Sequence, residues 1–259
     1  MPAADSRIKA VGKIVAIGGG NMRAFETLTI DREVIELAGK THCRALFIPT
    51  ASYDSKEYWE GFQRVYGGNL GCDTSVLYLL NQHPNFRELN DKILSADVIY
   101  VGGGNTLKMM RRWRKLGVDR LLQTAYEGGA VLAGVSAGAI CWFNYGHSDS
   151  MAFYHPDDWQ YIRVRGIGLV EALACPHFDG ETGGVKRSQD FMDMIRKYGG
   201  LGMAMDNHCA LVFIDGGFKV ITSRAGAGAY KIYREDSGIT VEEIVQSPGL
   251  RPVSALLQM

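Results

Sequence analysis

The sequence has no charge imbalance and no long apolar run, and each absence excludes a class of protein. Lysine plus arginine equals aspartate plus glutamate, with 28 of each, so there is no electrostatic reason to expect nucleic acid or an anionic membrane as a partner. No apolar run approaches the roughly 18 residues of a membrane-spanning helix, and the first residues lack the apolar core of a signal peptide. We therefore expect a soluble, cytoplasmic protein.

Cysteine is also sparse, and the usual signatures of metal and nucleotide sites are missing. The five cysteines are scattered, odd in number and never spaced as C-x-x-C, which favours reduced thiols over a disulfide frame or a zinc ribbon. No histidine pair follows H-E-x-x-H, and the glycine-rich turns match neither a P-loop nor G-x-G-x-x-G. The sequence therefore predicts no metal and no cofactor.

Glycine is abundant, with 32 in 259 residues, and several glycine-rich turns follow short apolar runs. Four such runs alternate with helical spacing before residue 130: Lys13–Ile17, Arg44–Ile48, Ser75–Leu80 and Asp97–Val101. This alternation predicts one α/β domain over residues 1–259, with a doubly wound, mostly parallel sheet and helices on both faces. Further along, Ala210–Ile214 and Phe218–Thr222 predict an antiparallel hairpin.

The central stretch is GGAVLAGVSAGAICWF, residues 128–143, where a buried strand runs directly into a helix. Ser136 lies at the sharp turn between them, within G-x-S-x-G. A serine there must adopt a strained backbone, and the small residues Gly134, Ala137 and Gly138 let the strand and the helix approach closely. We interpret Ser136 as a nucleophile; the alternative is a tight turn capped by serine.

A nucleophilic serine needs a base, and the base needs an orienting acid. His177 is the best-placed base, because it follows an apolar strand at the edge where active sites of parallel sheets gather. Asp206 is the predicted orienting acid, which leaves its neighbour His208 at the surface. Asp149 and Asp179 remain alternative acids.

The turn GGGNT at residues 102–106 has two interpretations. It is either a plain helix-capping turn or a backbone donor to the reacting carbonyl. In the second case an N–H group of Gly103 or Gly104 would complete an oxyanion hole with the N–H group of Ala137.

Together these motifs resemble the peptidase E / cyanophycinase family of serine peptidases, which share a fold with class I glutamine amidotransferases. Three pieces in order carry the resemblance: VGGGNT at residues 101–106, GVSAGA at residues 134–139 and PHF at residues 176–178. The order Ser…His…acid also fits, whereas α/β-hydrolases run Ser…Asp…His. The resemblance covers about Lys13 to Tyr233 and implies a flavodoxin-like, amidotransferase-like fold.

The resemblance also implies residue roles, with Ser136 as nucleophile and His177 as general base. Family members commonly carry glutamate as the third member, at the position of Asp206, and an older family assignment falls near Asp149. Peptidase E proper has tryptophan where this chain has Val135.

Peptidase E-like enzymes bind the aspartyl carboxylate of the substrate with a basic group. Arg187 is our candidate for that group, because an arginine can hold a carboxylate through two hydrogen bonds. Arg163 and Arg165 are further candidates.

We therefore predict a serine peptidase acting on small peptides, a dipeptidase that could be aspartyl-specific. Two alternatives remain. The first is a cyanophycinase-like isopeptidase or an esterase that uses the same triad with another pocket, and the second is a non-catalytic amidotransferase-like binding domain. The apolar run Val253–Leu257 could pack on its own domain or on a second copy of the chain, and in the second case the protein would be a homodimer.

Overall fold

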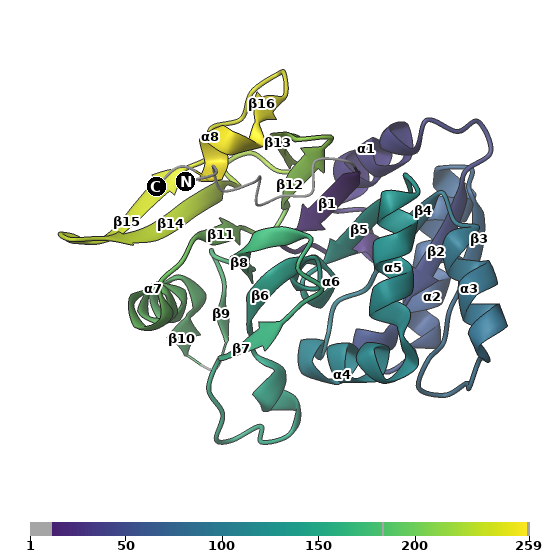
Figure 1. The fold of residues 1–259 in the computed structure, drawn as a ribbon, viewed down its shortest axis with the longest axis horizontal. Helices are drawn as coiled ribbons and strands as arrows, with labels where there is room; N and C mark the ends of the chain where they lie inside the picture. The colour runs from purple at the N-terminus through teal and green to yellow at the C-terminus, as the bar shows by residue number, and fades with distance from the viewer. Residues whose placement is uncertain (1–11, 183, 258–259) are drawn as a thin grey trace, which may run out of the picture.

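The computed structural model describes residues 12–182 and 184–257. Its larger sheet has eight strands, and Figure 1 shows how they are arranged. In spatial order these are β16 (Arg251–Pro252), β13 (Gly217–Thr222), β12 (Cys209–Ile214), β1 (Lys13–Ile17), β5 (Val131–Val135), β4 (Val98–Val101), β2 (Arg44–Ile48) and β3 (Asp73–Val76). Five neighbours in this order are mutually parallel, namely β1, β5, β4, β2 and β3. The other three strands, β12, β13 and β16, each pair in antiparallel fashion with the strand beside them. The predicted α/β class, parallel sheet and hairpin are thereby confirmed.

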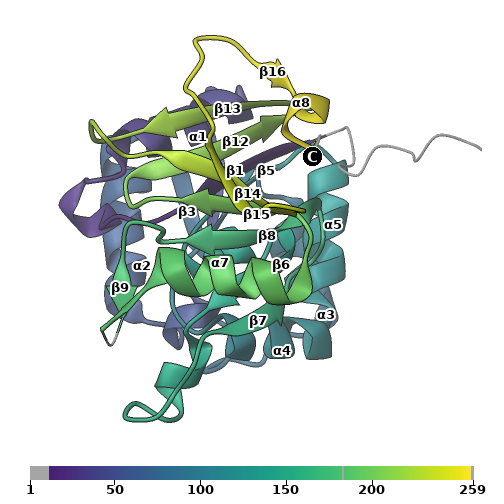
Figure 2. The ribbon, with the colours of Figure 1, turned by 90° about the vertical axis from the view of Figure 1, so that its left-hand side faces the viewer.

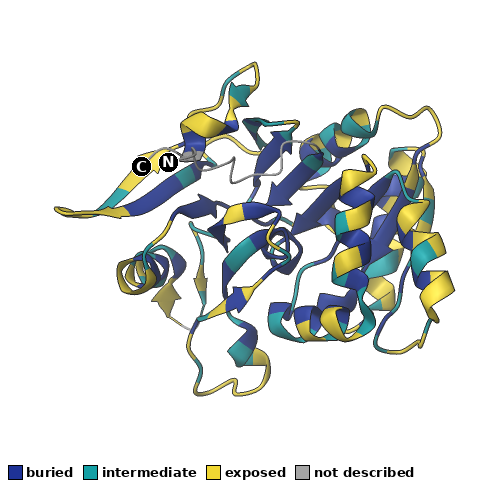
Figure 3. Cartoon of the chain, viewed as in Figure 1, coloured by how far each residue is buried: buried dark blue, intermediate teal, exposed yellow. Residues whose placement is uncertain are grey.

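Helices cover both faces of this sheet. Neighbouring residues of a strand point to opposite faces, and on each face their apolar side chains are buried against helices. One face carries α1 (Leu28–Ala38) and α2 (Lys56–Phe62), and the other carries α3 (Phe86–Leu94), α4 (Thr106–Leu116) and α5 (Val118–Glu127). In β1, for example, Val15 packs with the α1 side and Ile14 with the α5 side. The strands are therefore buried on both faces, and Figure 3 draws their buried residues in dark blue.

A second sheet of six strands lies beside the first, and the sequence analysis did not anticipate it (Figure 2). Its order is β15 (Gly238–Glu243), β14 (Ala229–Glu235), β11 (Gly202–Met205), β8 (Val170–Pro176), β6 (Phe143–Ser148) and β7 (Ile162–Arg165). The helix α7 (Arg187–Tyr198) covers one face, and the other face shares a core with the first sheet. The short α6 (Ala137–Ile140) lies in that shared core. A small ribbon of β9 (Glu181–Thr182) and β10 (Val185–Lys186) precedes α7.

Some predicted elements have different bounds in the structure. The strand that contains Ser75 ends at Val76 in the structure, and the N–H groups of Leu80 and Asn81 donate instead to the side chain of Asp54 at 2.6 and 2.9 Å. Near the C-terminus, α8 (Val253–Leu257) buries Val253 and Leu256 in the core of its own chain. Among the described residues, no helix combines the length and the apolarity needed to span a membrane.

Candidate active site

The glycine-rich turns of the first sheet gather at one edge. β1, β4 and β5 are parallel neighbours, so the turns after Ile17, Val101 and Val135 lie at their carboxyl ends. The N–H group of Ser136 donates to the carbonyl of Ile17 at 3.0 Å, which ties the serine to the end of β1. This is the edge at which parallel sheets place their ligands.

Ser136 has the strained backbone that the sequence analysis expected, with φ 57° and ψ −112°. A positive φ is uncommon for a residue with a side chain, and it turns the chain sharply from β5 into α6. Close approach explains the flanking glycines. A Cβ atom on Gly134 would lie 2.4 Å from the carbonyl oxygen of Gly138, and one on Gly138 would lie 2.1 Å from that of Val101.

The GGGNT turn lies directly beside the serine, and its glycines have different neighbours. A Cβ atom on Gly103 would lie 3.2 Å from the Cβ and 3.8 Å from the Oγ of Ser136. Gly104 instead lies against the carbonyl of Ala51, with φ 135°. Of the two glycines considered as backbone donors, Gly103 is therefore the one beside Ser136. Ala137 is buried as the first residue of α6, where a backbone N–H group has no partner within its helix.

His177 reaches the same edge from the second sheet. It follows β8 and has φ 137°, while Asn207 lies just after β11, the parallel neighbour of β8. The turn carrying Asn207 is tied to the first sheet, because the N–H group of His208 donates to the carbonyl of Gly19 at 2.8 Å. A Cβ atom on Gly19 would lie 2.4 Å from Nδ1 of His177. Glycine at this position thus lets the two sheets bring their strand ends together.

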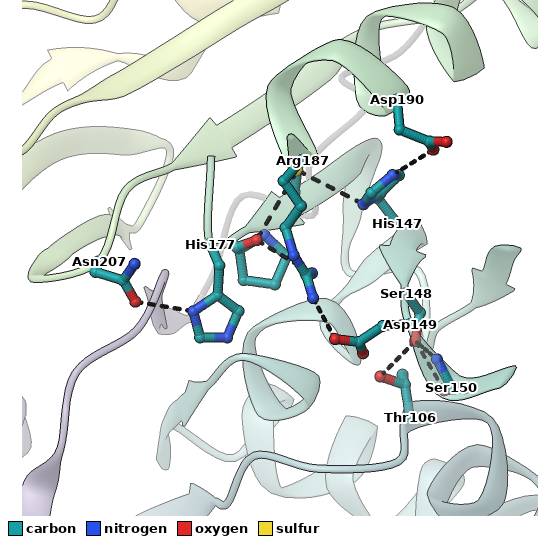
Figure 4. A network of polar contacts seen from close by, with 11 residues as sticks. Thr106, His147, Ser148, Asp149, Ser150, His177, Arg187, Asp190 and Asn207 are labelled. Carbon is teal, nitrogen blue, oxygen red and sulfur yellow. Dashed lines mark hydrogen bonds and ion pairs between the residues drawn. The ribbon is translucent and has the colours of Figure 1, made fainter. Parts of the chain in front are cut away.

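The ring of His177 pairs with an amide. Its Nδ1 lies 2.9 Å from Oδ1 of Asn207 (Figure 4). Nδ2 of Asn207 in turn donates to Oδ1 of Asp179 at 2.9 Å. A carboxylate only accepts hydrogen bonds, so the NH₂ group of Asn207 must face Asp179 and its oxygen must face the ring. Nδ1 of His177 therefore carries the proton, and Nε2 holds the lone pair of a base.

The predicted orienting acid makes other contacts. In the described part of the chain, Oδ2 of Asp206 accepts from the N–H group of Gly228 at 2.9 Å and from the hydroxyl of Tyr230 at 3.3 Å. The structure thus pairs His177 with Asn207 where the sequence predicted Asp206. Asp206 is buried, and this burial raises its carboxyl pKa above the ordinary value. Its neighbour His208, expected at the surface, is buried as well.

The alternative acid and the candidate substrate-binding arginine pair with each other. Nη2 of Arg187 donates to Oδ2 of Asp149, and Nη1 donates to the carbonyl of Pro176 at 3.4 Å. The Arg187 guanidinium also lies over the ring of Tyr161, 5.0 Å from its centroid. With 5% of its side chain exposed, Arg187 is a buried cation whose partner carboxylate belongs to its own chain.

Burial and charge keep His177 neutral. Desolvation is the largest cause that lowers the pKa of this imidazole, and the nearby Arg187 cation lowers it further. The Asn207 hydrogen bond and the Asp149 and Asp179 carboxylates act in the opposite direction. A neutral imidazole near pH 7 is the form that can accept a proton.

Two polar side chains at this edge were missed by sequence reasoning. Asn207 follows a strand and adjoins a candidate acid, which is a weak signal that could have drawn attention to it. The hydroxyl of Tyr58 accepts from the N–H group of Gly103 at 3.5 Å, and burial raises its pKa to about 12, so it stays protonated. Tyr58 and Asn207 both line a cavity of about 630 Å³. Within residues 12–182 and 184–257, no three His, Cys, Asp or Glu side chains are grouped so as to hold a metal ion.

Proteins of similar sequence are named as peptidases. The chain is 35% identical over 223 residues to the uncharacterized peptidase YgaJ of Bacillus subtilis (strain 168), covering 85% of this chain and 91% of that protein. It is 36% identical over 149 residues to the uncharacterized peptidase PM1590 of Pasteurella multocida (strain Pm70), covering 56% and 70%.

A solved structure of a peptidase from an acI-B1 actinobacterium has the same fold, with a TM-score of 0.69 at 19% identity over 93% of this chain and 97% of that one. The sequence profile of peptidase family S51 matches residues 14–221, a span that includes the Ser136, His177 and GGGNT segments. The resemblance to peptidase E is thereby confirmed, and the chain belongs to peptidase family S51.

Proposed function

We propose that this chain is a serine-type peptidase that cleaves small peptides, with Ser136 as nucleophile and His177 as general base. The observation that carries the proposal is the hydrogen bond between Nδ1 of His177 and Oδ1 of Asn207. It fixes the tautomer in which Nε2 can accept a proton, and Asp179 holds the amide in that orientation. Asn207 thus takes the orienting role for which the sequence suggested an acid, as asparagine does in papain-like proteases.

The reaction would proceed in two halves. Nε2 of His177 takes the proton from the Ser136 hydroxyl while Oγ bonds to the scissile carbonyl carbon. The resulting imidazolium then gives that proton to the leaving amine as the C–N bond breaks, which leaves an acyl group on Ser136. Water then attacks the acyl carbon while His177 takes its proton, and the imidazolium returns that proton to Oγ of Ser136 as the ester C–O bond breaks and the second product leaves with its new carboxylate.

The developing oxyanion needs donors beside Ser136. The N–H groups of Gly103 and Ala137 are the candidates, because one lies next to the serine in space and the other follows it in sequence. The Tyr58 hydroxyl now accepts weakly from Gly103, so a substrate oxygen could replace it without the loss of a strong bond.

Substrate size and bond type are tested by turnover. We would assay the wild-type protein and Ser136→Ala on Asp-X and neutral dipeptides, β-aspartyl-arginine and p-nitrophenyl esters. The proposal expects hydrolysis of dipeptides by the wild-type protein and loss of turnover in Ser136→Ala, with an unchanged circular dichroism spectrum. Cleavage of β-aspartyl-arginine alone would indicate the isopeptidase, and of esters alone the esterase. Full activity in Ser136→Ala would exclude the mechanism.

A further inference from the structure

A small pocket beside His177 contains the buried ion pair of Arg187 and Asp149. The pocket has a volume of about 240 Å³, and its lining also includes Glu181. This is smaller than the roughly 300–1,000 Å³ of sites for drug-sized ligands, so it fits one side chain or one chain terminus. Figure 4 shows Arg187 extending from the start of α7 toward Asp149, alongside the ring of His177. Under the proposed function, a substrate bound between Ser136 and His177 would lie beside the residues that line this pocket.

Both terminal nitrogens of the arginine already donate a hydrogen bond within the chain. Nη2 donates to Asp149 and Nη1 donates to the carbonyl of Pro176. An acidic side chain that took the place of Asp149 would leave that carboxylate without its partner in a half-buried position, and one that bound the other N–H groups would have to share the arginine with it. An uncharged side chain requires no such exchange.

The charge balance of the lining points in the same direction. Two carboxylates, Asp149 and Glu181, face one guanidinium, Arg187, and His177 is neutral because burial lowers its pKa. An incoming carboxylate would therefore enter a pocket that already has an excess of negative charge. Like charges at close range discriminate strongly between otherwise similar ligands.

We propose that Asp149 determines specificity in this pocket: it acts as a resident carboxylate on Arg187, so the pocket selects uncharged side chains over acidic ones. This inference rests on the proposed function, because it assumes that the pocket beside His177 receives part of a peptide. It differs from the aspartyl preference that the sequence resemblance implied. Asp149 thereby acts on substrate choice and not as the acid that orients His177.

The test is a binding measurement that needs no turnover. We would use Ser136→Ala protein and isothermal calorimetry at pH 8 with two pairs of dipeptides, Asn-Leu against Asp-Leu and Leu-Asn against Leu-Asp. Members of a pair differ by one charge and have nearly the same shape. In one of the pairs, the amide peptide should bind at least about tenfold more tightly, since an unpaired charged group typically costs that much or more.

Added variants then assign the preference to Asp149. In Ser136→Ala/Asp149→Asn, Arg187 becomes available and the preference should disappear or reverse. In Ser136→Ala/Arg187→Gln, no cation remains and the preference should grow, which keeps the test valid if the first variant folds poorly. Ser136→Ala/Asp193→Asn is the matched control, because Asp193 pairs with Arg196 on the same helix α7 and does not line this pocket. It should keep the wild-type preference.

Three results would overturn the inference: equal or tighter binding of the acidic peptide in both pairs, a preference that survives Asp149→Asn unchanged, or no binding of any peptide. A failure of the proposed function looks different. It would appear as turnover that is independent of Ser136, while the binding preference and its dependence on Asp149 remain.

Discussion

Oδ1 of Asn207 lies 2.9 Å from Nδ1 of His177, so the group that orients the candidate base is a neutral amide held in place by Asp179. An amide fixes the ring tautomer as a carboxylate does, but it contributes no full negative charge to stabilise the imidazolium. The lowered pKa of His177 is consistent with that difference, because burial is only partly offset.

Removal of the amide should impair catalysis without unfolding the protein. In Asn207→Ala the ring of His177 loses its partner and can adopt the wrong tautomer. We expect kcat on a cleaved dipeptide to fall by up to about 10⁴-fold, the loss seen when replacement of the orienting aspartate of a serine protease leaves the histidine in the wrong tautomer. The measurement is steady-state kinetics, with thermal unfolding as a check on the fold.

Asp206→Asn is the companion variant, since it changes the carboxylate that the sequence predicted as the orienting acid. Its side chain bonds to Gly228 and Tyr230, so we expect altered stability and at most a few-fold change in kcat. If Asp206→Asn abolished activity and Asn207→Ala had little effect, Asp206 and not Asn207 would be the residue that orients His177.

The acid limb of the pH–rate profile should report His177. Its imidazole pKa is lowered by burial, so kcat/KM should fall with decreasing pH only below the ordinary histidine value of about 6.5. Asp179 raises this pKa, and Asp179→Asn should therefore move the acid limb to still lower pH while also lowering kcat. A shift of the limb toward higher pH in that variant would contradict the electrostatic account.

Gly103 and Gly138 should respond differently to the same substitution. In Gly103→Ala the new methyl group would lie 3.2 Å from Cβ of Ser136, which crowds the nucleophile but can be relieved by small shifts. We expect a folded protein with lower kcat. In Gly138→Ala the methyl group would lie 2.1 Å from the carbonyl oxygen of Val101, and overpacking of this kind costs about 1–3 kcal/mol or more of unfolding free energy.

Chemical denaturation and dipeptide kinetics of both variants separate the two effects. A fully active Gly103→Ala would show that a methyl group at this position does not crowd Ser136, and an undiminished stability of Gly138→Ala would show that α6 can move away from β4.

The parts of the site that lie on the first sheet could be predicted because their signals are local. An apolar run, a G-x-S-x-G turn and a small-residue helix place Ser136 at a strand end without knowledge of any distant contact. The GGGNT turn follows a similar run at β4, and parallel strands bring the two turns together.

Asn207 could not be assigned in this way, because its contact depends on two strands of the second sheet. β8 and β11 are adjacent there, so the residues that follow them meet, yet 30 positions separate His177 from Asn207 in the chain. Two strands of the second sheet have weak sequence signals, because β6 reads FNYGHS and β15 reads GITVEE, with few apolar residues in a row. The direction in which Asp206 points is set by its contacts to Gly228 and Tyr230, which no local pattern reveals.

Labelling by a fluorophosphonate probe tests most directly whether His177 activates Ser136. The rate of labelling is measured by mass spectrometry of the digested peptides. The account predicts that the probe attaches to the peptide carrying Ser136, that Ser136→Ala takes up none there, and that His177→Ala reacts about 10²-fold or more slowly. An unlabelled Ser136 in wild-type protein that hydrolyses peptides, or equal labelling rates in wild-type protein and His177→Ala, would contradict it.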